Sequence, residues 1–148
     1  MVYADVDGNI GWFGGSIAPI RPRADWSGML PVPGNGEFEW RGFLPGSALP
    51  RVFNPPEGYV ATANEYNLPA DYRYKDMSAR TWAEPYRVQR IREVLADSKG
   101  QTVQGSQALQ YDNLSIPART LVGYAKSLNS ADSGLTQALG LLKGWDAR

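Results

Sequence analysis

The first half of the chain alternates apolar and polar residues over short distances, which is the pattern of β-strands. Residues 2–6 alternate, Asp7-Gly8-Asn9 has the composition of a tight turn, and Ile10 to Phe13 resumes the apolar run. A turn of this kind between two such runs predicts a β-hairpin over residues 1–16.

Turn-forming residues dominate the next segment. Residues 17–40 are rich in Pro, Gly and Arg, and residues 30–36 cannot pair in a central strand. We expect an ordered surface loop here, with a short alternating piece at residues 37–40. Residues 45–50 read as another turn, and residues 51–53 lead into the central stretch.

The central stretch, residues 54–64, has the composition of a proline-rich turn followed by a short strand. Pro55 and Pro56 remove two amide donors, so a strand cannot begin before Glu57. Residues 59–61 are then predicted to form a short strand that carries Asn64 to its C-terminal end. Residues 65–83 have many polar and aromatic side chains and little periodicity. We therefore expect a long loop, a feature that often lines a binding site.

The second half has helical periodicity. Pro85 suits the first turn of a helix, and Val88, Ile91, Val94 and Leu95 share one face before Lys99-Gly100 ends it. Further helices are predicted over residues 103–111, 116–128 and 131–142. Strands first and helices after indicate an α+β fold, with a strand and loop portion (1–83) and a helical portion (84–148). Because a small sheet would have open edges, we expect the two portions to form one incomplete domain.

Composition narrows the chemistry. The 148 residues contain no Cys and no His, which excludes disulfides, Cys nucleophiles, Ser-His-Asp triads and His-rich zinc sites within the chain. Fifteen cationic and fifteen anionic residues balance, so charge does not indicate a nucleic acid or an anionic membrane as partner. No apolar run is long enough for a transmembrane span, and the first residues lack the regions of a signal peptide.

Two polar patterns have competing interpretations. The spacing Asp5-x-Asp7-x-Asn9 is that of a calcium loop, but Ile10 and Ser16 replace the required Gly and Glu, and a turn explains it. The side-chain amide of Asn64 is either an ordinary turn residue or a donor to an oxygen that gains negative charge during acyl transfer.

The order of four sequence blocks indicates a family. The blocks are Tyr3-Ala4-Asp5-Val6-Asp7-Gly8-Asn9-Ile10-Gly11, Leu30-Pro31-Val32-Pro33-Gly34, Glu39-Trp40-Arg41-Gly42 and Asn54-Pro55-Pro56-Glu57-Gly58-Tyr59-Val60-Ala61-Thr62-Ala63-Asn64. They closely resemble the β-chain of the penicillin acylase family over roughly residues 2–95, whereas the helical remainder is similar in kind only. These are N-terminal-nucleophile amidohydrolases.

The resemblance implies an αββα sandwich and a precursor that is cut to expose a Ser at the start of the β-chain. That Ser is the nucleophile and its α-amino group is the general base. An α-amino group has a pKa of about 7.7–8.0, which suits this role near neutral pH. No Ser or Thr begins this chain, so we expect the nucleophile to lie outside it and the isolated chain to be inactive.

The resemblance also implies site residues. Asn64 matches the oxyanion-hole Asn, and Arg87 matches an Arg that orients the nucleophile and that Asn. The alternative for Arg87 is a solvated residue in the first turn of a helix. Asp76 and the carbonyl of Gly28 match two ligands of a structural Ca²⁺, although Asp76 also suits a helix cap or a surface carboxylate. Since Ca²⁺ needs six to eight oxygens, this chain cannot complete the site alone.

The partners implied are an acyl amide substrate, an α-chain and the remaining β-chain segments. The acyl group is left open between β-lactam side chains, acyl-homoserine lactones and other amides. Family members are typically periplasmic or secreted. The competing hypothesis is a stand-alone module that binds a carbohydrate or a peptide through its many Trp and Tyr residues.

Overall fold

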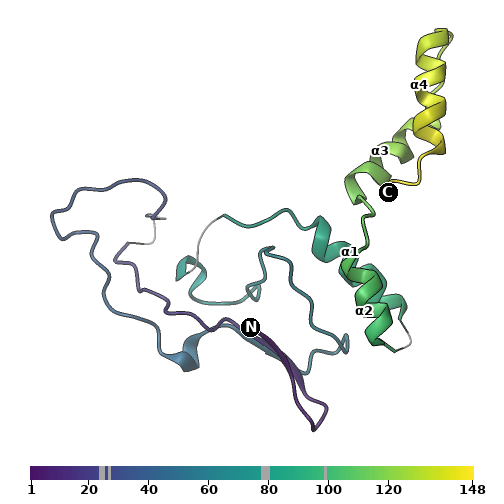
Figure 1. Ribbon diagram of the computed structural model, residues 1–148. Helices are drawn as coiled ribbons and strands as arrows, with labels where there is room; N and C mark the ends of the chain where they lie inside the picture. Colours follow the sequence, from purple (N-terminus) through teal and green to yellow (C-terminus); the bar gives the residue numbers. More distant parts are fainter. Residues whose placement is uncertain (24–25, 27, 78–80, 99) are drawn as a thin grey trace. The chain divides into compact units, whose positions relative to one another are not determined.

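The computed structural model describes residues 1–23, 26, 28–77, 81–98 and 100–148, and the side chain of Asp76 is outside the described part. The chain divides into two compact units, Met1–Pro85 and Tyr86–Arg148. In Figure 1 the first unit runs from purple to teal, and the second, which holds the four labelled helices, runs from teal to yellow.

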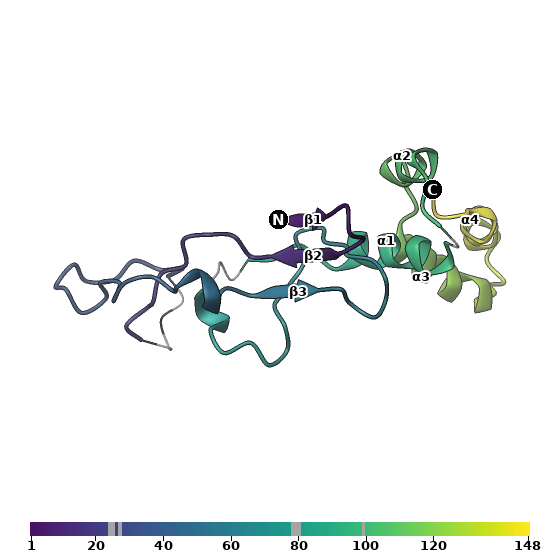
Figure 2. The same cartoon turned by 90° about the horizontal axis from the view of Figure 1, so that it is seen from below.

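The first unit is built on a three-stranded antiparallel sheet. Its strands are β1 (Val2–Ala4), β2 (Ile10–Phe13) and β3 (Arg51–Phe53), in that order across the sheet. Figure 2 shows the three strands side by side. The predicted hairpin is confirmed, whereas β3 lies where the sequence indicated only a lead-in to the central stretch.

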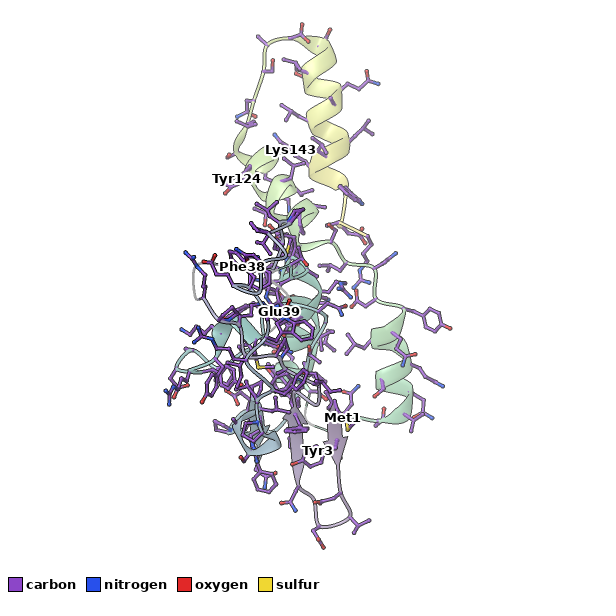
Figure 3. All side chains as sticks on the ribbon, turned by 90° about the vertical axis from the view of Figure 1, so that its left-hand side faces the viewer. Met1, Tyr3, Phe38, Glu39, Tyr124 and Lys143 are labelled. Carbon is purple, nitrogen blue, oxygen red and sulfur yellow. The ribbon has the colours of Figure 1, made fainter. Side chains whose placement is uncertain are left out.

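Gly11 makes room for an aromatic ring in this sheet. Gly11 pairs with Tyr3, which Figure 3 labels on β1, and a Cβ at position 11 would lie 2.6 Å from atoms of the Tyr3 ring. A larger residue at position 11 would therefore push that ring aside.

A hydrogen-bonded turn closes the hairpin and joins it to β3. The Asp5 carboxylate accepts the backbone N–H groups of Asp7 (3.1 Å) and Asn9 (2.8 Å) and the Asn9 side-chain amide (2.9 Å). These bonds, chiefly that from the Asn9 side chain, lower the pKa of Asp5. The Asn54 amide in turn accepts the Ile10 N–H (2.9 Å) and donates to the Asn9 side chain (2.8 Å). The end of β3 is thus locked to the turn that precedes β2.

The expected surface loop after the hairpin is held by backbone pairing. Ile20 and Arg41 form two of its bonds, from the Ile20 N–H to the Gly42 carbonyl and from the Arg41 N–H to the Ile20 carbonyl, each 2.9 Å. Pro19 and Phe43 form an isolated bridge between the same segments. The alternating piece at residues 37–40 does not form a strand.

The prediction of a strand over residues 59–61 is wrong. These residues have no assigned secondary structure, because none of the described strands pairs with them. Residues 65–83 are a loop as expected in the described part, interrupted by a short 3₁₀ turn, η2 (Lys75–Met77). Another, η1 (Gly46–Ala48), lies in the predicted turn, and its Ala48 carbonyl accepts the Tyr72 hydroxyl at 2.8 Å.

The second unit confirms the helical predictions. Its helices are α1 (Tyr86–Asp97), α2 (Val103–Gln110), α3 (Ile116–Ser127) and α4 (Ser133–Gly144). Side-chain caps start three of them, because Thr102, Ser115 and Asp132 each accept a backbone N–H three residues ahead. The cap at Asp132 explains why α4 begins two residues later than predicted.

Helices α3 and α4 form a helical hairpin, which Figure 1 shows in green and yellow. Val122 and Ala125 are the buried residues of α3, and Val88 is the buried residue of α1, which packs against α3. The ammonium group of Lys143 on α4 donates to the Leu128 carbonyl at the end of α3 (2.7 Å). Figure 3 labels Lys143 together with Tyr124 of α3.

The strands of one unit and the helices of the other agree with the predicted α+β class. The complete αββα sandwich and the single incomplete domain stay predictions. Of the helices that the structure describes, none has both the length and the apolar character to cross a bilayer.

Candidate functional site

Asn64 lies on an exposed turn in the first unit. Its φ angle is +65°, in the left-handed region that few residues other than Gly occupy. Asn tolerates this conformation better than most side chains because its short polar group interacts with the nearby backbone. The residue is therefore delivered to the surface by a turn and not by a strand end.

Hydrogen bonds hold both sides of this turn. The Asn64 carbonyl accepts the Ala83 N–H at 2.7 Å. The Glu65 carboxylate folds back to accept the Ala63 N–H at 2.6 Å and the Thr62 hydroxyl at 3.4 Å. These bonds therefore restrain the backbone on both sides of Asn64.

Aromatic packing supports the same turn from the side. Tyr66 and Trp82 meet edge to face, with ring centroids 5.4 Å apart. Asn67 adds a side-chain hydrogen bond to the Thr62 hydroxyl at 3.1 Å. Residues 62–67 and 82–83 thus form one local structure, which we name the Asn64 turn.

Arg87 is the second residue of α1 and is exposed. It lies on a groove of about 550 Å³ in the second unit. Apolar side chains form much of the wall of this groove, among them Ile91, Leu109, Leu114 and Ile116. Asn64 and Arg87 belong to different units, so the pairing of the two residues stays a prediction.

An ionic network joins the part of α1 that follows Arg87 to Asp112 and to α3. The Arg90 guanidinium donates two hydrogen bonds to Asp112, at 3.0 and 2.7 Å, and one to Glu93 at 3.1 Å. Glu93 also accepts a bond from Arg119 of α3 at 3.1 Å. The bond from Arg90 lowers the pKa of Asp112, and the bonds from Arg119 and Arg90 lower the pKa of Glu93.

The two predicted calcium ligands are only partly described. Asp76 belongs to η2, but its side chain lies outside the described part. Gly28 is exposed with φ +76°, and a Cβ at that position would lie 3.3 Å from the Arg21 guanidinium. Within the residues described, no cluster of three acidic side chains could hold a metal ion. A carboxylate and a carbonyl suit Ca²⁺ as hard oxygen donors, but they are too few to hold it.

Sequence reasoning missed the residues that support the site. Glu65 was indistinguishable from other polar residues in an aperiodic loop, and its burial depends on the fold. Asn54 was assigned to a proline turn, although its side chain joins β2 and β3. Only the pair Arg90 and Glu93, three residues apart on a predicted helix, carried a signal in the sequence.

A family model described as penicillin amidase matches residues 1–148. The chain is 37% identical to penicillin acylase 2 proenzyme of Pseudomonas sp. (strain SE83) and 36% identical to penicillin G acylase of Escherichia coli, over 100% and 92% of its length. It is 34% identical, over 93% of its length, to the acyl-homoserine lactone acylase QuiP of Pseudomonas syringae pv. tomato. It covers 19%, 16% and 17% of these three proteins, so it spans less than a fifth of the curated relatives it matches.

A solved structure has a similar fold. The thermostable penicillin G acylase from Alcaligenes faecalis superposes with a TM-score of 0.72 at 28% sequence identity. The match covers 99% of this chain and 27% of that one.

Proposed function

The chain belongs to the penicillin amidase family, and we propose that it is a segment of an acylase that cleaves an acyl amide bond through an N-terminal Ser on another segment. We refer to that larger protein as the parent acylase. Family membership over the whole chain supports the reaction class, since the named relatives are acylases.

The observation that carries the proposal is the Asn64 turn. Attack of a Ser hydroxyl on the substrate carbonyl converts the carbonyl oxygen into an oxyanion. A donor that is already in place stabilises this charge without reorganisation during the reaction. Asn64 is an exposed residue on a turn restrained on both sides, and its side-chain amide is suited to be such a donor.

Two further roles are part of the proposal. Arg87 orients Asn64 and the nucleophile, a role for which its exposed guanidinium on the first turn of α1 is suited. Asp76 and the Gly28 carbonyl contribute two oxygen ligands to a structural Ca²⁺, with the other ligands supplied by other segments of the parent acylase.

The partners proposed are the α-chain and the other β-chain segments of the parent acylase, which is made as a precursor and exported to the periplasm or secreted. One relative is named a proenzyme, which favours the precursor. The relatives are named for penicillin and for acyl-homoserine lactones, so the proposal leaves the acyl group of the substrate open.

A carbohydrate- or peptide-binding module is the second candidate. Trp40 and Phe43 favour it, because both are more than half exposed and meet edge to face at 6.0 Å. Their exposure fits equally well with a surface covered by another segment of the parent acylase. Membership of the penicillin amidase family over all residues of the chain supports the acylase more strongly than the binding module.

The test is Asn64→Ala in the parent acylase. Loss of one oxyanion donor lowers kcat by about 100- to 1000-fold. Steady-state kinetics on an amide substrate measure the loss, with Asn35→Ala as the control because this exposed Asn lies outside the Asn64 turn. A kcat near that of the parent in Asn64→Ala would remove Asn64 from the mechanism.

A further inference from the structure

We propose that Glu65 is a positioning residue that holds the oxyanion donor in place. The inference rests on the proposed function of Asn64 and deepens it. The role proposed for Glu65 is exerted through the backbone of the Asn64 turn and not by contact with a reacting atom.

The burial of Glu65 is unusual for its residue type. The residue is only 4% exposed, although it lies in a loop and next to an exposed Asn. A buried carboxylate lowers stability unless hydrogen bonds satisfy it. One oxygen of Glu65 accepts the Ala63 N–H at 2.6 Å, so this oxygen has a close backbone donor.

This bond encloses Asn64. The acceptor belongs to the residue after Asn64 and the donor to the residue before it, so the bond closes a short ring around the Asn64 backbone. Within the ring Asn64 has φ +65°, a conformation that costs free energy for any residue with a Cβ. The Glu65 bond stabilises the chain in this conformation.

The position of the Asn64 side chain depends on the same ring. Its Cα–Cβ direction is set by the backbone, which is restrained on the other side by the bond from Ala83. An oxyanion donor must be held in place before the reaction begins, and a misplacement of about 1 Å can lower the rate about 100-fold. Release of the ring would let the peptide rotate and move the amide away from its productive position.

The experiment compares Glu65→Gln with Glu65→Ala in the parent acylase. The Gln side chain keeps an oxygen that can accept the Ala63 N–H, whereas Ala removes it. We expect Glu65→Gln to stay within about threefold of the parent, and Glu65→Ala to lose about 10- to 100-fold in kcat with KM unchanged. Asn35→Ala is the matched control, because it truncates an exposed Asn outside the Asn64 turn and leaves the Ala63 bond intact.

A double variant separates positioning from general damage. If Glu65 acts through Asn64, Glu65→Ala should lower kcat little further in an Asn64→Ala background, so the effects are not additive. Additive losses in kcat would overturn the inference. A steep loss of kcat in Asn64→Ala together with a parent-like kcat in Glu65→Ala would overturn this inference alone. A parent-like kcat in Asn64→Ala would overturn the proposed function.

If Glu65→Ala does not fold, the kcat of Glu65→Asp tests the same inference. Asp retains the acid but is one methylene shorter, so it cannot span the same ring with the same geometry. We expect a lower kcat than in Glu65→Gln at similar KM. A kcat in Glu65→Asp equal to that of the parent would contradict the proposal.

Discussion

At the scale of single residues, two asparagines whose backbone is in the left-handed region lie at the two ends of residues 54–64. Asn54 ends β3 with φ +43°, and Asn64 has φ +65° ten residues later. Each has a hydrogen-bonded partner that offsets the strain, the Ile10 N–H for Asn54 and the Ala83 N–H for Asn64. The prolines and the glycine between them predicted a turn, but the conformation of both ends became visible only in the fold.

Asn54 offers a stability test with a matched pair of substitutions. Asn54→Gly removes the bonds to Ile10 and Asn9 and tolerates the positive φ, so we expect a cost of about 1 kcal/mol. Asn54→Ala removes the same bonds and adds backbone strain, which raises the cost to about 2 kcal/mol. Thermal unfolding of the parent acylase measures both. Equal midpoints for the Ala and Gly variants would contradict a role for backbone strain.

At the scale of elements, the helices were predictable and the strands only in part. Helices α1 to α4 satisfy their own hydrogen bonds and carry local signals, such as Pro85 before α1 and the apolar face that Val88, Ile91 and Val94 form on it. A strand needs a partner that sequence does not identify. The run at residues 59–61 therefore looked like a strand and is not one, whereas residues 51–53 pair with β2.

The ionic network between α1 and its neighbours predicts a pH dependence. The folded pKa values of Asp112 and Glu93 are lowered, so their contribution to stability is complete above the unfolded values of about 4 and is lost as pH falls through the folded values. Asp112→Asn should therefore destabilise the parent acylase clearly at pH 7, and the difference should shrink towards pH 3. Unfolding midpoints across this range measure it, and a constant difference would contradict the assignment.

At the scale of the whole molecule, the chain displays apolar side chains that an independent protein would normally bury. Trp40, Leu121, Tyr124, Leu135 and Leu141 are each more than half exposed. Other segments of the parent acylase would cover such residues, in keeping with the small share of each relative that the chain spans. From its short sheet the sequence predicted an incomplete domain, but it could not specify the surfaces that would cover these side chains.

The isolated 148-residue chain provides the corresponding test. Without an N-terminal Ser it should not hydrolyse phenylacetyl or acyl amides, and its thermal unfolding should be broad because few strands pair. An amide hydrolysis assay and a thermal melt monitored by circular dichroism measure the two expectations. Turnover above background would contradict the placement of the nucleophile on another segment, and a sharp transition would contradict the incomplete domain.

The contact between Lys143 and the Leu128 carbonyl bears on how such an enzyme could be attached to a solid support. Resins that form amides with surface amines abolish the positive charge and leave one neutral N–H, which is a weaker donor to the carbonyl at the end of α3. Reductive coupling to aldehyde resins leaves a secondary amine that is still protonated. Aldehyde chemistry is therefore the gentler choice for immobilising a protein that carries this helical hairpin.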